Sequence, residues 1–132
     1  MGMLARFLGF AGSRRDLLAD LLEVYRGEAE QAAHLRQQAV QAAYPQVTTA
    51  LEALAATEEQ HVAWLRERIV VLGGEIPPLA PAPLRGHNQW RRVVAAHQAA
   101  LAKRKRIVDL VNRWDPEEPE VVAVLSRIEQ ED

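Results

Sequence analysis

The stretch PQVTTALEALAATEEQHVAWLRERIVVL, residues 45–72, shows the helical pattern of this chain most clearly. Its apolar positions recur at alternating steps of three and four residues, the spacing of one face of an amphipathic helix. Pro45 suits the first turn of a helix, and Gly73 and Gly74 suit the stop after the last turn. Two ionisable residues interrupt the apolar line, which reads Val47, Leu51, Leu54, Glu58, His61, Leu65, Ile69 and Leu72. The segment therefore predicts a long helix with Glu58 and His61 on its buried face.

A second long helix is expected before this segment. Ser13, followed by Asp16 three residues later, has the pattern of an N-cap with an acidic partner, which predicts a helix start at about residue 14. That helix should run to about residue 43, because Tyr44 precedes Pro45 and a residue before proline disfavours helical geometry. Residues 1–12 are expected to form a short N-terminal cap or a contact between copies of the chain.

Two more helices are expected after residue 74. Residues 75–87 contain four prolines, which predicts an extended crossover without a helix of its own. A third helix is expected over residues 88–114 and a fourth over residues 117–132. Two hairpins joined by a crossover predict an all-α fold, a single antiparallel four-helix bundle over residues 1–132. The fourth helix is about half as long as the others, so we expect the natural chain to continue beyond it.

Composition narrows the classes of function. The 132 residues are 48% apolar, and 16 basic against 18 acidic residues leave a net charge of −2. This balance disfavours nucleic acid and anionic membranes as partners, and no segment approaches the ~20 apolar residues of a membrane span. The N-terminus lacks the features of a secretory signal, so we expect a cytoplasmic protein. Because cysteine is absent, any metal must be held by His, Glu and Asp, which suits iron, manganese or zinc.

The helix expected over residues 14–43 also carries a glutamate in its apolar stripe, which reads Leu17, Leu21, Val24, Glu28, Ala32, Leu35 and Ala39. Glu28 lies about as far before the turn at Tyr44 as Glu58 lies after it, so an antiparallel hairpin places the two carboxylates at nearly one level. Like charges in one apolar pocket repel each other, and a divalent cation is the usual remedy. Without a cation, we expect one of the two carboxyl groups to hold a proton.

The second half of the chain resembles the first in a weaker form. The third helix is expected to bury a stripe with one histidine: Trp90, Val94, His97, Leu101, Val108 and Val111. Residues 103–106 form a basic run, of which one or two side chains must lie along the bundle by their aliphatic stems. The fourth helix should bury Val121, Leu125 and Ile128, and its next buried position is expected to be Glu131 or Asp132.

The motifs YRGEAE (residues 25–30) and EEQHV (residues 58–62) resemble the first half-site of ferritin-like and rubrerythrin-like proteins. In that family a Glu and an E-x-x-H on the first two helices bind a pair of irons, and a second set on the other two helices completes the site. The resemblance implies Glu28 and Glu58 as ligands or bridges and His61 as a terminal ligand. It implies His97 and Glu131 as further metal ligands, although residues 88–114 contain no glutamate and the second E-x-x-H is only half present.

The resemblance implies a di-iron site, with manganese or zinc as other candidates, and oxidation of iron(II) by dioxygen or peroxide. Such a protein would serve iron handling or defence against oxidative stress, and we expect a homo-oligomer. One alternative is a non-catalytic scaffold whose metal site has degenerated. Another is a metal site completed between two copies of the chain, each of which supplies one hairpin.

Overall fold

The computed structural model describes residues 3–79 and 89–131, and these contain four helices and no strand. The helices are α1 (Met3–Gln41), α2 (Pro45–Val71), α3 (Gln89–Trp114) and α4 (Pro119–Glu131). The prediction of an all-α fold with four helices is confirmed. The helix boundaries agree with the sequence pattern to within a few residues, except at the start of α1.

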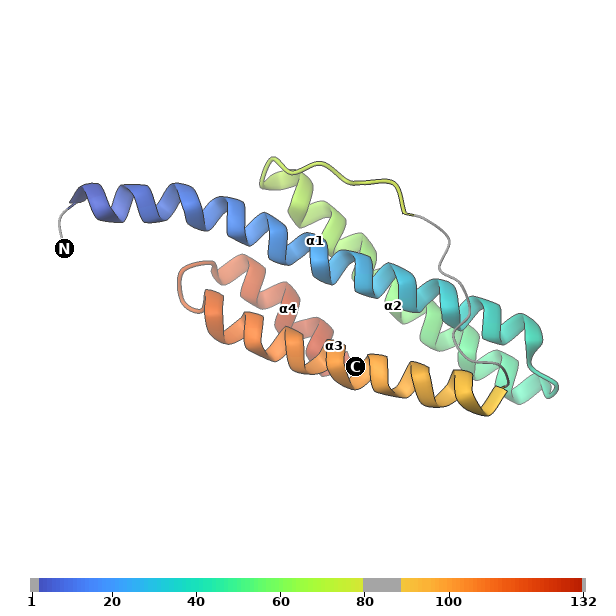
Figure 1. The fold of residues 1–132 in the computed structure, drawn as a ribbon. Coiled ribbons are helices and arrows are strands. Elements are labelled where there is room, and N and C mark those ends of the chain that lie inside the picture. Colours follow the sequence, from blue (N-terminus) through green and yellow to red (C-terminus); the bar gives the residue numbers. More distant parts are fainter. Residues whose placement is uncertain (1–2, 80–88, 132) are drawn as a thin grey trace.

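Each helix packs against two others, as in a helical bundle (Figure 1). The described pairs are α1 with α2, α3 with α4, α1 with α3 and α2 with α4. The chain reverses direction between α1 and α2, so that Arg14 near one end of the pair donates to the carbonyl of Leu72. Because α4 has only 13 residues, it lies against one half of α2 and α3, and the other half meets no fourth helix (Figure 1).

The turns follow the sequence signals. Tyr44 is extended, with φ −116° and ψ 132°, and Pro45 opens α2. Gly73 has φ +85°, the left-handed conformation that glycine adopts at low cost after a helix. Residues 75–79 are not helical, as predicted for the crossover, and residues 80–88 lie outside the described part.

The predicted start of the first helix is wrong. α1 begins at Met3, and residues 3–12, expected to form a cap, are part of the same helix. Ser13 lies inside this helix and therefore does not cap its N-terminus. The segment before Ser13 contains no proline, so nothing in the backbone forces a break there, and the N-cap pattern alone did not decide the boundary.

One apolar core joins the four helices. It consists of Leu17, Leu21, Val24, Tyr25, Leu65, Ile69, Ile107, Leu110, Trp114, Val121, Leu125 and Ile128. On α1 the predicted stripe from Leu17 to Ala39 is buried except at Leu35, which is half-buried. On α4 all three predicted positions are buried.

The predicted buried face of α3 is wrong by about one residue, a rotation of roughly 100° about the helix axis. Of the predicted positions, His97, Leu101 and Val108 are exposed, Val94 and Val111 are half-buried, and the side chain of Trp90 lies outside the described part. The buried residues are instead Ile107, Leu110 and Trp114. The first half of α3 is rich in alanine, and small side chains distinguish the faces of a helix poorly. On α2, Val47 and Leu54 are also exposed, because they precede the part of the helix that α4 reaches.

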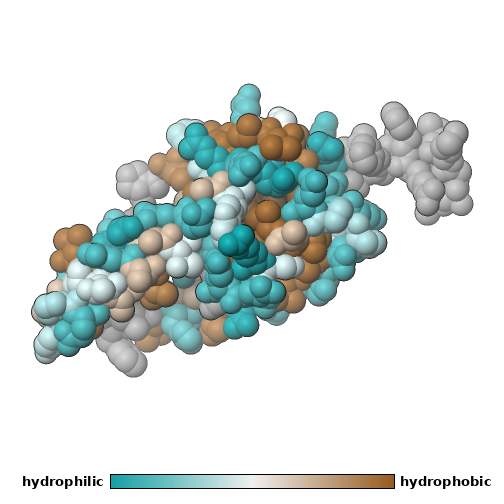
Figure 2. Space-filling model, turned by 180° about the vertical axis from the view of Figure 1, so that it is seen from behind, coloured by the Kyte–Doolittle hydropathy of each residue, from teal (hydrophilic) through white to brown (hydrophobic). Residues whose placement is uncertain are grey.

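Hydrophilic residues cover most of the face shown in Figure 2, and hydrophobic residues gather between them in smaller areas. None of the described helices combines the length and the apolar character that crossing a membrane requires.

Candidate metal centre

Two carboxylates and an imidazole meet in the middle of the core. Glu28 comes from α1, and Glu58 and His61 come from α2. Glu28 and His61 are 0% exposed and Glu58 is 7% exposed. One possible ligand atom of each residue lies within 4.8 Å of those of the other two. Charged groups buried to this degree require a compensating charge or hydrogen bonds.

The local sequence explains this convergence. Glu58 and His61 are three residues apart in α2, so they share one face of the helix. On the facing helix, Val24 and Ala32 are buried one turn before and one turn after Glu28. The apolar neighbours pack the two helices together, and the polar groups lie in the same interface because they share the buried faces.

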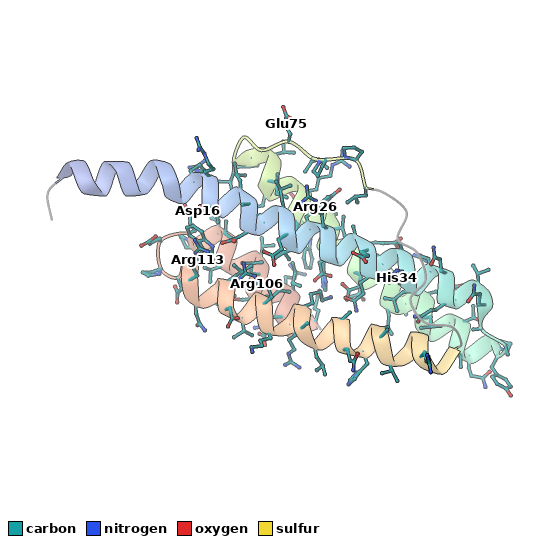
Figure 3. The ribbon with its side chains drawn as sticks, in the orientation of Figure 1. Asp16, Arg26, His34, Glu75, Arg106 and Arg113 are labelled. Carbon is teal, nitrogen blue, oxygen red and sulfur yellow. The ribbon has the colours of Figure 1, made fainter. Side chains whose placement is uncertain are left out.

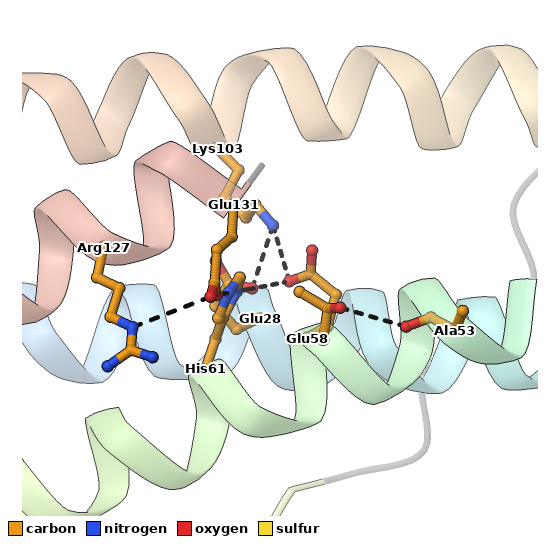
Figure 4. A network of polar contacts seen from close by, with 8 residues as sticks. Glu28, Ala53, Glu58, His61, Lys103, Arg127 and Glu131 are labelled. Atoms are coloured by element: carbon orange, nitrogen blue, oxygen red, sulfur yellow. Dashed lines mark hydrogen bonds and ion pairs between the residues drawn. The ribbon is translucent and has the colours of Figure 1, made fainter.

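His61 contacts three carboxylates through its two ring nitrogens. Its Nδ1 lies 3.4 Å from Oε2 of Glu28 and 3.6 Å from Oε2 of Glu58. Its Nε2 lies 2.6 Å from Oε2 of Glu131, in the last turn of α4. Glu131 therefore holds the imidazole from the side opposite the other two carboxylates (Figure 4).

Lys103 of α3 is the central residue that the sequence pattern missed. Its Nζ donates to Oε2 of Glu28 at 3.1 Å and to Oε2 of Glu58 at 3.0 Å (Figure 4). Its side chain is 11% exposed. A signal was present in the sequence, because Lys103 precedes the buried Ile107, Leu110 and Trp114 at helical steps of four, three and four.

The ammonium group changes the expected charge state of the centre. Burial raises the pKa of the Glu58 carboxyl, but the hydrogen bond to His61 and the charge of Lys103 outweigh burial and hold the pKa below its ordinary value. A proton on Glu58 is therefore not required to offset the repulsion between the two carboxylates. Lys103 thus supplies, from within the chain, the positive charge that the sequence led us to expect from a metal ion.

One acceptor in the centre is left over. Oε1 of Glu28 is buried and accepts no hydrogen bond from any residue in the described part of the chain. A buried carboxylate oxygen without a donor is costly, and a bound cation is one group that satisfies it. The donor set, carboxylate oxygen and imidazole nitrogen, is that of iron(II), manganese(II) and zinc(II) sites. The residues thus fit a divalent metal ion.

Arg127 lies between Glu131 and Trp64 and contacts both. The guanidinium of Arg127 lies over the Trp64 ring, 4.2 Å from its centroid, and its Nε is 3.9 Å from Oε1 of Glu131. The Trp64 ring lies 5.6 Å from the His61 ring, measured between centroids. These contacts join the end of α4 to the middle of α2.

A separate network sets the position of α3 against α1. The indole Nε1 of Trp114 donates to Oδ2 of the buried Asp20 at 2.9 Å, and Arg106 and Arg113 lie 3.4 and 3.3 Å from the same carboxylate. Figure 3 shows both arginines on the α1 side of α3. Because Lys103 precedes Arg106 by one turn on this face, the network also directs Lys103 towards Glu28.

Four of the five residues singled out in the sequence therefore come together, namely Glu28, Glu58, His61 and Glu131. His97 was predicted to lie on the buried face of α3, but it is exposed. It precedes Lys103 by six residues, or about 9 Å along the axis of α3. A single chain brings Glu28, Glu58 and His61 together, so these three need no second copy.

In comparisons with known proteins, no family model, curated protein or solved structure matches this chain.

Proposed function

We propose that this chain is a ferritin-like metal-binding protein that holds a divalent cation between α1 and α2. Iron(II) is the cation that we favour. The observation that carries the proposal is the convergence of Glu28, Glu58 and His61 in the core, with one buried oxygen of Glu28 lacking a donor. The packing of α1 with α2 and of α3 with α4 supports the comparison with ferritin-like connectivity.

Each residue of the centre has a role in this proposal. Glu28 and Glu58 supply oxygen ligands, and His61 supplies Nδ1, the ring nitrogen that faces both carboxylates. Glu131 accepts a hydrogen bond from Nε2 of His61, which orients the imidazole and increases its strength as a ligand. In a site with two ions, Glu131, which contacts Nε2 of His61, is the candidate for a further carboxylate ligand.

Bound iron(II) would supply electrons for the reduction of dioxygen or peroxide. The surrounding residues exclude bulk water from the centre and keep the carboxylates close to the imidazole. An iron-handling role or a role in oxidative-stress defence follows if the bound iron turns over.

A second candidate is a non-catalytic scaffold, and Lys103 favours it. The ammonium of Lys103 already pairs with Glu28 and Glu58, so the core is compensated without a metal ion. Under this alternative the buried charges specify how the helices pair, and the protein acts as a binding or structural module.

Metal content separates the two candidates. The protein is incubated with iron(II) without oxygen, passed through a desalting column and analysed for iron. The wild type should retain iron and His61→Ala should not, whereas His97→Ala, at an exposed histidine, should behave as the wild type. Equal, low retention in all three proteins would favour the scaffold.

A second measurement tests turnover. Iron(II) is added to the air-equilibrated protein, and its oxidation is followed against the same iron(II) in buffer. Acceleration by the wild type that is lost in Glu58→Gln supports oxidation at the centre. Retained iron without acceleration would limit the proposal to metal binding.

A further inference from the structure

The ammonium group of Lys103 lies where a single cation can pair with the carboxylates of both Glu28 and Glu58. Its Nζ lies 3.1 Å from Oε2 of Glu28 and 3.0 Å from Oε2 of Glu58. A metal ion bound by the same oxygens would lie about 2.0–2.2 Å from them. An ammonium group and a dication that share these oxygens would repel each other strongly, because the centre is buried. Metal and ammonium therefore exclude each other at this place.

The structure also contains space beside the lysine. A cavity of about 170 Å³ lies between α1 and α3, and Lys103 is part of its lining. That volume is several times the ~30 Å³ that one water molecule occupies in the liquid. On the α3 side the lining consists of small residues, Ala95, Ala96 and Ala99. On the α1 side it includes Gly27, where an added Cβ would meet no atom within 4 Å.

The cavity can receive a charged group. Glu30, Gln31 and His34 of α1 line it, so an ammonium that turns into it meets polar atoms and a carboxylate. The lysine stem is flexible, with four carbons between the backbone and the ammonium. Rotations of that stem would carry Nζ from the two carboxylates towards the cavity that Lys103 itself lines.

We propose that Lys103 is a displaceable internal cation, which pairs with Glu28 and Glu58 in the metal-free protein and turns into the α1–α3 cavity when a divalent metal ion binds. This inference rests on the proposed function. It makes Lys103 the residue that sets metal affinity and selectivity, since an incoming ion must replace a monovalent charge. Divalent ions are favoured over monovalent ones, and the metal-free core keeps its charge balance.

Calorimetric titration with manganese(II), at constant pH and salt, tests the exchange in the full chain. Lys103→Met removes the charge and keeps much of the stem. It should bind manganese(II) more tightly than the wild type, by a factor in the range of roughly 5–150 typical of coupled sites. If Lys103→Met binds equally or more weakly, the lysine does not compete with the metal and the inference is wrong.

The cavity is tested by filling it. Gly27→Leu projects a side chain into the space that Lys103 would need, so manganese(II) binding should weaken. In the Lys103→Met background the same substitution should have no effect, because no ammonium has to move. Gly27→Ala is the matched control and should leave affinity unchanged in both backgrounds. An equal effect of Gly27→Leu in the two backgrounds would rule out the cavity as the destination.

The wild type offers a measurement that does not depend on variants. The chain contains two lysines, Lys103 and the exposed Lys105, so Lys105 serves as an internal reference. Acetylation by an amine-reactive ester, read by mass spectrometry, should show a higher ratio of Lys103 to Lys105 modification with saturating manganese(II) than without. A ratio that does not change would contradict the displacement.

These results also separate the inference from the function on which it rests. If neither the wild type nor Lys103→Met binds manganese(II), iron(II) or zinc(II), the proposed metal function fails. If both bind with the same affinity, the metal function stands and only the role of Lys103 is lost.

Discussion

At the scale of single residues, the centre is a set of charges that compensate one another. Three carboxylates, those of Glu28, Glu58 and Glu131, surround one imidazole. Lys103 and Arg127 are the positively charged side chains paired with them among the described contacts. Breaking one buried pair leaves its partner without compensation, and this usually costs more than the pair itself contributes.

Glu58 gives this balance a pH dependence. Its pKa in the folded protein lies below the ordinary value of 4.5, so the unfolded chain takes up the proton more readily. The stability that Glu58 contributes is therefore complete above the ordinary pKa and is lost as the pH falls through the lowered one. Urea unfolding from pH 7 to pH 3 should show wild-type stability falling on the acid side. Glu58→Gln should show a smaller fall, and Glu52→Gln, on the exposed side of α2, should keep the wild-type slope.

Trp114 tests the second polar network at the same scale. Trp114→Phe keeps an aromatic ring in the core but removes the donor that serves Oδ2 of Asp20 at 2.9 Å. Because Asp20 is 8% exposed, we expect a loss of about 1–3 kcal/mol in the free energy of unfolding. Denaturant titration measures it, and the loss should be smaller in an Asp20→Ala background. An unchanged midpoint in Trp114→Phe would mean that Arg106 and Arg113 satisfy Asp20 without the indole.

At the scale of the helices, the sequence predicts where each helix begins and ends better than it predicts which face of the helix is buried. Proline and glycine act directly on the backbone, so the breaks at Tyr44, at Gly73 and after Trp114 were predictable. The buried face was predictable where large apolar residues alternate with charged ones, as around Glu28 and His61. It was not predictable in the alanine-rich first half of α3, and there the error put His97 in the place of Lys103.

Gly27 shows how a helix interior can be improved without a change in packing. Glycine in the middle of a helix is about 1 kcal/mol less favourable than alanine, and a Cβ at Gly27 meets no atom within 4 Å. Gly27→Ala should therefore raise the free energy of unfolding by about that amount. Gly74→Ala is the contrasting variant, because its Cβ would lie 2.8 Å from Cγ2 of Ile69 and 2.9 Å from Cδ2 of Leu18, and it should destabilise the protein. Both values come from denaturant unfolding, and a stabilising Gly74→Ala would show that these contacts relax easily.

At the scale of the whole molecule, the centre joins the two hairpins. α1 and α2 supply Glu28, Glu58 and His61, whereas α3 supplies Lys103 and α4 supplies Glu131. The sequence predicted the contribution of the first hairpin because both of its helices carry strong apolar stripes. In the second hairpin Glu131 was predicted, but Lys103 was not, because its position depends on how α3 docks on α1, where Trp114 donates to Asp20.

A metal ion at this junction should stabilise the whole fold and not only one helix. A ligand that binds the folded chain at 100 times its dissociation constant adds about 2.7 kcal/mol, provided that it does not bind the unfolded chain. Thermal melts at neutral pH should therefore show a clear rise in melting temperature with manganese(II) or iron(II) for the wild type and for His97→Ala. The rise should be absent in His61→Ala and Glu58→Ala, and it should shrink near pH 5, because protons compete with the metal for the imidazole and the carboxylates.

Glu58→Leu completes this test. Because Lys103 can still pair with Glu28 in this variant, the metal-binding protein and the non-catalytic scaffold predict different responses of its stability to metal. If the centre is only a set of structural charges, Glu58→Leu leaves Lys103 paired with Glu28 and exchanges a buried carboxylate for apolar surface. Stability without metal should then be kept or increased, and metal should change neither the wild type nor the variant. If the centre binds metal, the variant can be equally stable without metal, but the rise in melting temperature on adding manganese(II) must disappear. A variant that still responds to metal as the wild type does would exclude Glu58 as a ligand.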